Sequence, residues 1–480
     1  STAYSAMRGY VSARDMRNDE YFSYVEENLL NIDNFIAYHL AVIYFQNFDI
    51  GNIKCWRPRA VKGRFRWMMY DQDYGFNLWK PEIYVPAMAR DYGDYDNMFE
   101  FYTEDSGTGT GWPNAGGRTL LLRRLLMNEG FKARFIRRCA DLLNGPFRED
   151  RVVKTIHRIA DGIRPEIGRH LERWSWPELQ KRGYGKPHQP EHEPFTRETW
   201  EKNIQVLIDF AEARPEKLRR DCAETFGMTG GLAEIAVDIE PPGSGRVQLN
   251  TLKLADFPWT GVYFRDAAAR ATAIPAPGYR FAGWTGAGVE WNEPRWELPL
   301  GDMTNRISLR ARFEPIELNA PETPPVVITE IQYHPASDRE TGDWVELHNP
   351  GTEPIGLAGW ILRDENDGRE FLLPEITLAP GGYFVLCQDV DKFTRFHADA
   401  ANYAGNFTFG LGNGGDTLRL FGPRGTLMLS LAFGDDAPWP PGADGTGRTL
   451  ELIDPENYSA SPSAWRASTA VGGSPGAAGL

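Results

Sequence analysis

The stretch Asn47-Phe48-Asp49-Ile50-Gly51-Asn52 is followed, after one short intervening segment, by Tyr70-Asp71-Gln72-Asp73-Tyr74-Gly75-Phe76. The intervening segment has two arms, residues 52–57 and 64–70, and the second arm alternates basic side chains with aromatic or apolar ones. Alternation with a period of two residues predicts strands, and a Gly between two such arms favours a tight turn. The sequence therefore predicts a β-hairpin between a loop that carries Asp and Asn and a loop that carries Asp, an aromatic residue and Gly.

The polar side chains of these two loops suit the transfer of a phosphoryl group. Protein kinases use the same order of parts: a loop with Asp and Asn, a hairpin, and an Asp-aromatic-Gly segment. Mg²⁺ prefers hard oxygen ligands, which Asp73 and Asn52 would supply, with Asp71 as the competing candidate. Asp49 would accept the proton of a substrate hydroxyl. The alternative is structural, because residues of these types also form ordinary capped turns.

Length and composition limit the class of protein. A chain of 480 residues should hold about three domains. Hydrophobic residues make up 41% of it, enough for packed cores, and no long apolar run predicts a membrane span. The four cysteines lie too far apart in sequence for a zinc motif or a small disulfide framework, so we expect core thiols at Cys55, Cys139, Cys222 and Cys387.

Charge is spread unevenly along the chain. Residues 1–228 hold 34 Lys and Arg against 33 Asp and Glu, whereas the remaining residues hold 18 against 33. An acidic C-terminal part argues against non-specific binding of nucleic acid. We therefore expect no nucleic acid among the partners.

The residue pattern changes twice along the chain and predicts a multidomain α+β protein. Residues 1–228 show mainly helical periodicity, with helices expected over 20–30, 34–48, 118–128, 131–143, 149–163, 166–174 and 199–211. Residues 229–315 turn to Gly, Pro, Trp and β-branched residues, which predicts a small β domain. Residues 316–325 form a Pro-rich linker, and residues 326–480 show the short alternating strands of a β-sandwich.

The helix expected over 34–48 is apolar nearly all round. Such a helix should be buried, so it would hold Asp49 rigidly at its end. Asp33 is the expected N-cap of this helix.

The N-terminal motifs, taken in order, resemble those of the CotH family of atypical bacterial kinases. The resemblance covers residues 1–225 and implies the C-terminal lobe of a kinase-like fold, with its active site at the β-hairpin. It rests on the two loops quoted above and on Asp33-Asn34-Phe35-Ile36, Ile53-Lys54-Cys55-Trp56-Arg57, Arg66-Trp67, Leu125-Leu126-Met127-Asn128, Asp141-Leu142-Leu143-Asn144 and His170-Leu171.

The resemblance implies transfer of phosphate from ATP to Ser or Thr hydroxyls of a protein substrate, with Mg²⁺ as the cofactor. Asp49 matches the catalytic Asp of the family, and Asp73 matches the metal-binding Asp that precedes the Gly. Asn52 would be the second metal ligand, and Asp71 would support the metal shell. Trp67 would stack on the adenine.

The chain departs from the family pattern at its N-terminal end. The family's N-terminal lobe should stand well upstream of Asp33, but the 32 residues before Asp33 lack a Gly-rich strand followed by a phosphate-contacting Lys. The chain also opens Ser1-Thr2-Ala3 without a signal sequence. We therefore expect a C-terminal lobe without the N-terminal lobe that covers the nucleotide. Such a fragment would be inactive on ATP by itself.

The C-terminal motifs resemble the lamin-tail domain, an immunoglobulin-like sandwich. The matching segments are Thr329-Glu330-Ile331, Asp343-Trp344-Val345-Glu346-Leu347, Leu357-Ala358-Gly359-Trp360, Gly415-Asp416-Thr417-Leu418 and Leu450-Glu451-Leu452. Asp343 and Glu346 flank Trp344 and Val345, which predicts one packed and one wet face for this strand. In bacteria such domains resemble add-on modules of secreted or surface proteins, which implies a location outside the cytoplasm.

Two shorter segments suggest further features. Pro277-Gly278-Tyr279-Arg280-Phe281-Ala282-Gly283-Trp284 resembles a signature of bacterial surface β-repeats, and we expect its Phe281 and Trp284 to fill a core. The acidic turn from Asp364 to Asp367 would suit Ca²⁺. Its spacing matches no known calcium loop, so a solvated hairpin turn is the alternative.

The rival interpretation is a non-catalytic extracellular surface or adhesion protein. In that case the kinase-like fold is a scaffold and the lamin-tail domain does the binding, because a fold alone does not determine a function. In the first interpretation, the partner is a protein substrate such as a cell-surface or coat protein.

Overall fold

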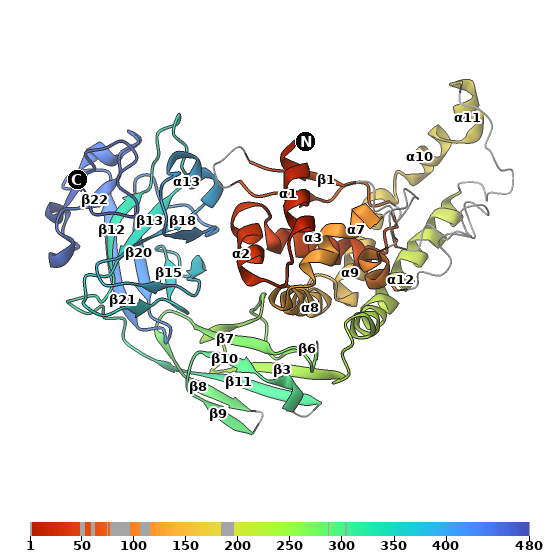
Figure 1. Cartoon of the computed structure of the whole chain (residues 1–480), viewed down its shortest axis with the longest axis horizontal. Coiled ribbons are helices and arrows are strands. Elements are labelled where there is room, and N and C mark those ends of the chain that lie inside the picture. Colours follow the sequence, from red (N-terminus) through yellow and green to blue (C-terminus); the bar gives the residue numbers. More distant parts are fainter. Residues whose placement is uncertain are drawn as a thin grey trace. The chain divides into compact units, whose positions relative to one another are not determined.

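The computed structural model describes residues 2–48, 53–58, 63–73, 75–76, 97–105, 116–183, 196–286, 288–302 and 305–479. The chain divides into two compact units, which are described one at a time (Figure 1). The first unit contains residues 1–57, 64–233 and 262–268, and the second contains residues 58–63, 234–261 and 269–480.

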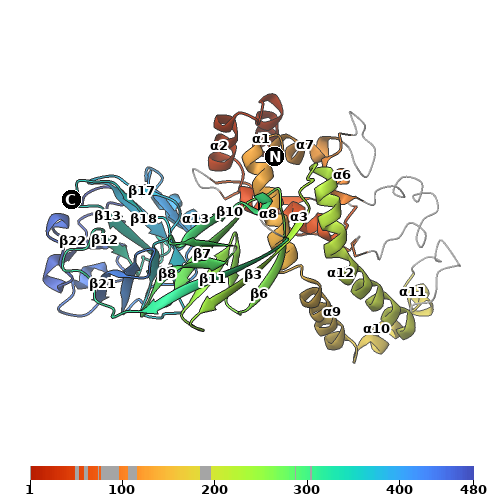
Figure 2. The same cartoon turned by 90° about the horizontal axis from the view of Figure 1, so that it is seen from below.

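The first unit is mainly helical, as predicted. Its helices are α1 (Thr2–Ala13), α2 (Asp19–Asn28), α3 (Ile32–Phe45), α6 (Met98–Thr103), α7 (Gly116–Leu125), α8 (Glu129–Asn144), α9 (Glu149–Ile163), α10 (Ile167–Arg173), α11 (Trp176–Lys181) and α12 (Arg197–Thr225). The seven helices expected from the sequence are confirmed, whereas α1, α6 and α11 were not predicted. Helix α12 packs along α9 (Figure 2) and continues past Pro215.

Helix α3 forms the centre of the first unit. Most of its side chains are buried, including Phe35, Ile36 and Leu40, which confirms the prediction from its apolar pattern. Its N-cap is Asn31, whose side chain accepts a hydrogen bond from the backbone N–H of Asn34. The expected N-cap at Asp33 is therefore wrong, because the helix begins earlier and includes Asp33 in its first turn.

The small β domain consists of two sheets. Its strands are β3 (Leu232–Glu240), β4 (Gly245–Leu249), β5 (Leu252–Leu254), β6 (Trp259–Phe264), β7 (Ala269–Pro275), β8 (Tyr279–Gly286), β9 (Val289–Trp291), β10 (Arg295–Leu298) and β11 (Arg306–Pro315). They are ordered β10-β7-β4-β5 and β6-β3-β11-β8-β9. Phe281 and Trp284 are each 1% exposed, which confirms that they fill a core. The resemblance of this segment to surface β-repeats stays a prediction.

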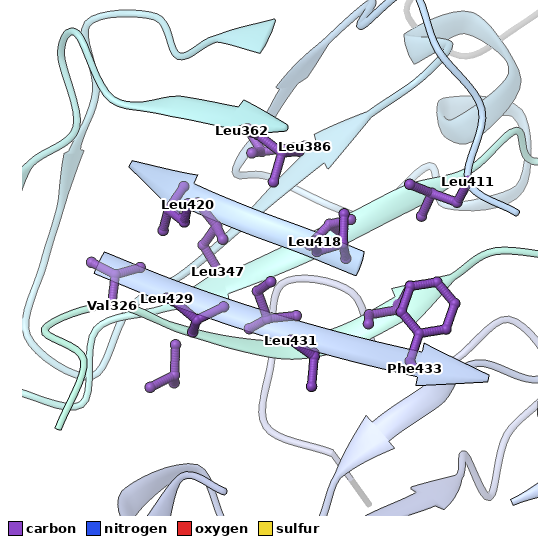
Figure 3. Packing of buried hydrophobic residues seen from close by; sticks show 14 of the residues in the cluster. Val326, Leu347, Leu362, Leu386, Leu411, Leu418, Leu420, Leu429, Leu431 and Phe433 are labelled. Atoms are coloured by element: carbon purple, nitrogen blue, oxygen red, sulfur yellow. The ribbon is translucent and has the colours of Figure 1, made fainter. Parts of the chain in front are cut away.

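The C-terminal part is a β-sandwich, which confirms the predicted fold class. Its elements are β12 (Val327–Gln332), β13 (Trp344–His348), β14 (Ile355–Gly356), β15 (Ile361–Arg363), β16 (Glu370–Leu372), β17 (Thr377–Leu378), β18 (Tyr383–Cys387), α13 (Val390–Phe396), β19 (Tyr403–Gly405), β20 (Gly415–Phe421), β21 (Leu427–Gly434), β22 (Leu450–Leu452) and β23 (Trp465–Ala467). The larger sheets are ordered β19-β18-β13-β12-β22-β23 and β16-β15-β20-β21. Figure 3 shows Leu418 and Leu420 of β20 with Leu429 and Leu431 of β21 in the core of this sandwich.

Within the second unit, the small β domain is joined to the sandwich by apolar packing and by backbone bonding. Ile274 of β7 packs in one buried cluster with Ile361, Phe421 and Leu427 of the sandwich. The backbone N–H of Phe281 donates to the carbonyl of Arg424 at 2.8 Å. The intervening residues 316–325 form neither helix nor strand. The predicted domain boundaries at 228/229, 315/316 and 325/326 stay predictions.

The described residues also bear on cysteine use and on membrane spans. Cys139, Cys222 and Cys387 are buried and Cys55 is half-buried, and all four thiols are free.

Among the residues that the structure describes, no helix combines the length and the apolar character that a membrane crossing requires.

Candidate functional site

The predicted hairpin is present and lies beside α3. Strands β1 (Lys54–Trp56) and β2 (Arg66–Met68) pair antiparallel, with Cys55 opposite Trp67. The side-chain amide of Asn34 on α3 binds the backbone of Trp67 on both sides, accepting from its N–H at 2.6 Å and donating to its carbonyl at 3.2 Å. The hairpin is therefore attached to the buried helix that precedes the first loop.

Asn47 joins the two loops that the sequence singled out. Its side chain is 1% exposed, and its amide donates to the side-chain oxygen of Gln72 at 2.8 Å and to the carbonyl of Asp71 at 3.4 Å. The hydroxyl of Tyr102 on α6 donates to the carbonyl of Asn47 at 2.8 Å. The start of the first loop is therefore held against the Asp71–Asp73 segment by direct hydrogen bonds.

The second loop is also fixed to the end of α3. The backbone N–H of Phe76 donates to the carbonyl of Phe45, the last residue of α3, at 2.7 Å. A Cβ atom at Gly75 would lie 2.8 Å from that same carbonyl oxygen, closer than packed atoms allow. Gly75 is therefore required by the close approach of two backbone segments.

A Gly75→Ala variant should lower the free energy of unfolding of the first unit by about 1–3 kcal/mol, because the added methyl group must push two backbone segments apart. Gly162→Ala is the matched control. Gly162 lies in the last turn of α9 with nothing within 4 Å of the added Cβ, so this change should stabilise by at most about 0.5–1 kcal/mol. Urea denaturation measures both, and equal effects would contradict the close approach at Gly75.

The structure describes only some of the predicted site residues. Asp71 and Asp73 have exposed side chains, and Asp71 has a left-handed backbone with φ of 55°. Asp49 and Asn52 lie outside the described residues, so their predicted roles stay predictions. Among the described residues, no group of three or more His, Cys, Asp or Glu side chains is arranged to hold a metal ion. Asp71 and Asp73 do supply the hard oxygen atoms that Mg²⁺ prefers.

Trp67, the predicted adenine-stacking residue, faces the interior. Its side chain is 4% exposed and meets Phe35 edge to face, with ring centroids 4.9 Å apart. To stack on a base, the ring would have to leave this packing. Its predicted role stays a prediction.

The opposite face of the hairpin is exposed and combines aromatic, apolar and basic side chains. Trp56 is 43% exposed and Met68 is 47% exposed. The Arg66 guanidinium lies 5.5 Å from the centre of the Trp56 ring, and the Lys54 ammonium lies 3.3 Å from the centre of the Tyr70 ring. An aromatic surface with cations beside it suits a ligand such as a nucleotide, whose planar base can stack on a ring and whose phosphates carry negative charge.

Three residues that support this site were not predicted from the sequence. Gln72 and Tyr102 hold Asn47, as described above. Arg214 of α12, 2% exposed, donates to the carbonyls of Ile43 and Tyr44 near the end of α3, at 2.6 and 2.8 Å. Arg214 lies three residues beyond the helix predicted over 199–211, so the sequence carried no signal for this contact.

The carboxylates of the acidic turn proposed for Ca²⁺ form ion pairs with arginines. Asp364 is fully buried and accepts from Arg369 at 2.9 Å, and Asp367 pairs with Arg419 at 2.7 Å. Positive side chains therefore already neutralise both carboxylates. The Ca²⁺ expectation stays a prediction, and this pairing does not favour it.

The comparisons with known proteins agree with the motifs. Residues 2–218 match the CotH kinase protein family. Residues 319–435 match the Lamin Tail Domain. Both resemblances read from the sequence are thereby confirmed, and the matched CotH kinase region contains both loops and the hairpin. None of the curated proteins matches the chain.

A likeness to one solved structure adds nothing to this assignment. The crystal structure of a DUF4876 family protein from Bacteroides thetaiotaomicron is similar over 46% of this chain and 86% of its own, at 11% identity and with a TM-score of 0.20. At that score the likeness carries no argument about the fold or the site.

Proposed function

We propose that the CotH kinase region, residues 2–218, supplies the catalytic and metal-binding residues of a kinase that transfers phosphate from ATP to Ser or Thr hydroxyls of a protein. One observation carries the proposal: Asn47 joins the loop that contains Asp49 to the loop that contains Asp71 and Asp73. A phosphoryl-transfer site needs its catalytic carboxylate and its metal-binding carboxylate at a fixed separation. The hydrogen bonds of Asn47 supply such a restraint.

In the proposed reaction, the substrate hydroxyl oxygen forms a bond to the γ-phosphorus of ATP, and the bond from that phosphorus to the bridging oxygen breaks. ADP leaves with the electron pair, and Asp49 takes the proton of the hydroxyl. Asp73 and Asn52 would hold Mg²⁺, with Asp71 in support. Bound there, Mg²⁺ would neutralise phosphate charge.

The hairpin suggests where the nucleotide would lie. The exposed face formed by Lys54, Trp56, Arg66 and Met68 lies on the hairpin whose second strand leads to Asp71 and Asp73, and it offers two aromatic rings, Trp56 and Tyr70, each with a cation over it. This chemistry suits a base and its phosphates. It offers a second platform for the adenine beside the buried Trp67.

Titration calorimetry with Mg²⁺ and ATP, combined with transfer of labelled phosphate to a generic protein acceptor, tests the proposal. It should use this chain and a version that carries any upstream coding sequence. Asp73→Ala should weaken MgATP binding by more than about tenfold, because a carboxylate ligand is lost. Asp49→Ala should leave binding intact but slow transfer by about 10²–10⁴-fold.

Asp209→Ala, at an exposed position on α12, is the matched control and should change neither property. Absence of MgATP binding in both versions of the folded protein would overturn the proposal. It would favour the non-catalytic surface protein, in which the kinase-like fold is a scaffold.

We further infer that the protein works at the cell surface or outside the cell, with the lamin-tail domain localising the kinase region or binding its substrate. The support is the Lamin Tail Domain match over residues 319–435, since the sequence of this domain resembles add-on modules of secreted proteins. Fractionation of the producing cells tests the location, and a purely cytosolic protein would contradict it.

A further inference from the structure

Three glutamate side chains form a buried row across neighbouring strands of the sandwich. Glu330 of β12 stands opposite both Glu346 of β13 and Glu451 of β22. Their exposed fractions are 1%, 1% and 3%. The prediction of a wet face for the strand with Glu346 is therefore wrong. Like charges directly opposite one another destabilise a sheet, and burial of a carboxylate adds a desolvation cost. The three carboxylates must therefore be protonated or be compensated by hydrogen-bond donors or positive charges.

The C-terminal strap, residues 473–479, covers this row. The backbone N–H of Ser474 donates to both carboxylate oxygens of Glu330, at 3.1 and 3.2 Å. The Ser474 hydroxyl donates to Glu451 at 3.3 Å, and the backbone N–H of Gly476 donates to Glu346 at 2.5 Å. Each of the three carboxylates is therefore bonded directly to the strap.

The strap is also tightly fitted against the row. A Cβ atom at Gly473 would lie 1.7 Å from a carboxylate oxygen of Glu330, and one at Gly479 would lie 1.7 Å from a carboxylate oxygen of Glu451. Gly473 has φ of 69°, in the left-handed region that favours glycine. Glycine at these two positions is what lets the backbone lie directly on the carboxylates.

The groups around the row balance only part of its charge. Arg466 of β23 donates to Glu451 at 3.1 Å, which gives that carboxylate a positive partner. The hydroxyls of Thr329 and Thr449 donate to Glu346 and Glu330, respectively. These hydroxyls are neutral, and among the residues that the structure describes no basic side chain forms an ion pair with Glu330 or Glu346.

Two further titratable side chains lie at the Glu346 end of the row. His348 stacks on Tyr383, with ring centroids 4.2 Å apart, and lies 3.9 Å from Glu456. Burial lowers the pKa of His348, so the imidazole is neutral near pH 7. Burial also raises the pKa of Tyr383, so the phenol keeps its proton. Neither group compensates a negative charge on Glu346.

Burial raises the pKa of Glu330 to about 8 and that of Glu346 to about 7, and repulsion from neighbouring glutamates adds to both shifts. Because these values lie above the usual value of 4.5, the folded state binds more protons than the unfolded state. The resulting stabilisation is fully present below pH 4.5 and is lost as the pH rises through about 7 and 8.

We propose that the C-terminal strap is a pH-operated latch, closed over the three glutamates in mildly acidic conditions and open in mildly alkaline ones. Ionisation of Glu330 and Glu346 places two uncompensated like charges side by side in the buried row. Opening of the strap gives up the N–H bonds of Ser474 and Gly476, which favour the charged carboxylates, but it lets water reach them and removes the desolvation that is the largest cause of both raised pKa values. The open state presents the row as an acidic surface on the sandwich.

Hydrogen exchange of the C-terminal peptide in the whole chain, corrected for the intrinsic pH dependence of exchange, tests the latch. Between about pH 6 and pH 8.5, protection of the strap amides should fall by at least roughly tenfold, the factor that corresponds to one pKa unit. The double variant Glu330→Gln/Glu346→Gln should keep its protection at both pH values. Glu353→Gln, at an exposed position, should behave as the parent chain does.

Equal protection of the parent chain at both pH values would overturn the proposal, and so would an equal loss of protection in the double variant. If the double variant does not fold, a chain that ends at Gly472 serves instead. Without the strap, the glutamates are open to water at every pH. The fall in melting temperature between pH 6 and pH 8.5 should then shrink to less than half that of the parent, and an unchanged fall would also overturn the latch.

Discussion

A Glu370→Ala variant is expected to lower the free energy of unfolding of the second unit by about 3–5 kcal/mol, because it leaves a buried guanidinium without its counter-charge. Glu370 accepts from Arg363 at 2.8 Å and also pairs with Arg246. The side chains of Glu370 and Arg363 are 6% and 2% exposed. Burial lowers the pKa of Arg363, and Glu370 acts in the opposite direction, so the carboxylate offsets part of the cost of burying this cation.

The position of this ion pair enlarges the expected effect. Arg363 also donates to the carbonyl of Pro275 at 3.0 Å, and Arg246 belongs to β4. Glu370 therefore orients two arginines at the junction of the small β domain with the sandwich. For a unit of this size, each kcal/mol corresponds to about 2–4 °C, so the melting temperature should fall by on the order of 10 °C.

Glu375→Ala is the matched control for this prediction. Glu375 also pairs with two arginines, Arg270 and Arg295, but its side chain is 53% exposed. Exposed ion pairs contribute at most about 1 kcal/mol. Calorimetry of the whole chain should therefore show a small shift for Glu375→Ala and a large shift for Glu370→Ala. Shifts of equal size would show that burial of the Glu370 pair has no energetic consequence.

The sequence predicted which helices the first unit contains better than it predicted the residues at which they begin and end. Helix α3 could be predicted because its apolar pattern runs almost all round, but it ends at Phe45 since Gln46 adopts a left-handed backbone, with φ of 57°. Gln carries no sequence signal for that conformation. Asn31 and Asp33 are both suitable N-caps by residue type, and only the geometry of the chain selects Asn31.

The contacts that assemble the candidate site could not be predicted from a sequence pattern. The loops with Asp49 and Asp73 were recognised from residue order, but the bond from Asn47 to Gln72 depends on where the hairpin returns the chain. Trp67 was expected at the nucleotide, whereas the pleat of β2 turns its ring toward α3. Residue order thus indicated candidate residues for the proposed site, and strand geometry decided which side chains face outward.

The sandwich shows a different limit of sequence reasoning. Alternation placed Glu346 on the wet face of its strand, and the pleat does turn it away from the core. A strap that begins more than a hundred residues later, near Ser474, then covers that face. Local periodicity carries no information about a distant segment that packs on an outer face.

Replacing Arg214 by leucine is expected to destabilise the first unit by about 3–5 kcal/mol and to weaken MgATP binding at the proposed site. Arg214 donates to two carbonyls in the last turn of α3. Hydrogen bonds to a charged group contribute about 1.5–3 kcal/mol each, and a cation at a helix C-terminus gains further from the helix dipole. Leucine fills only part of the space of the buried Arg214 side chain and leaves both carbonyls without these donors.

Arg220→Leu is the matched control, because Arg220 belongs to the same helix but is exposed. Surface changes of this kind alter stability by less than about 0.5 kcal/mol. Arg214→Lys should fall between the two, since an ammonium keeps the charge but lacks the planar fork that reaches two carbonyls at once. Urea denaturation of the three variants gives the order of stability, and an equal effect of Arg214→Leu and Arg220→Leu would contradict it.

The effect of Arg214 on the site follows from where α3 ends. Gln46 and Asn47 come directly after the carbonyls that Arg214 binds, and Asn47 in turn holds the Asp71–Asp73 segment. Without the hydrogen bonds from Arg214 to the carbonyls of Ile43 and Tyr44, the last turn of α3 would fray. The start of the loop that carries Asp49 would then no longer be held in place. Arg214→Lys should recover MgATP affinity together with stability, since both depend on the same helix end. Recovery of stability without recovery of affinity would mean that the helix end does not position the proposed site.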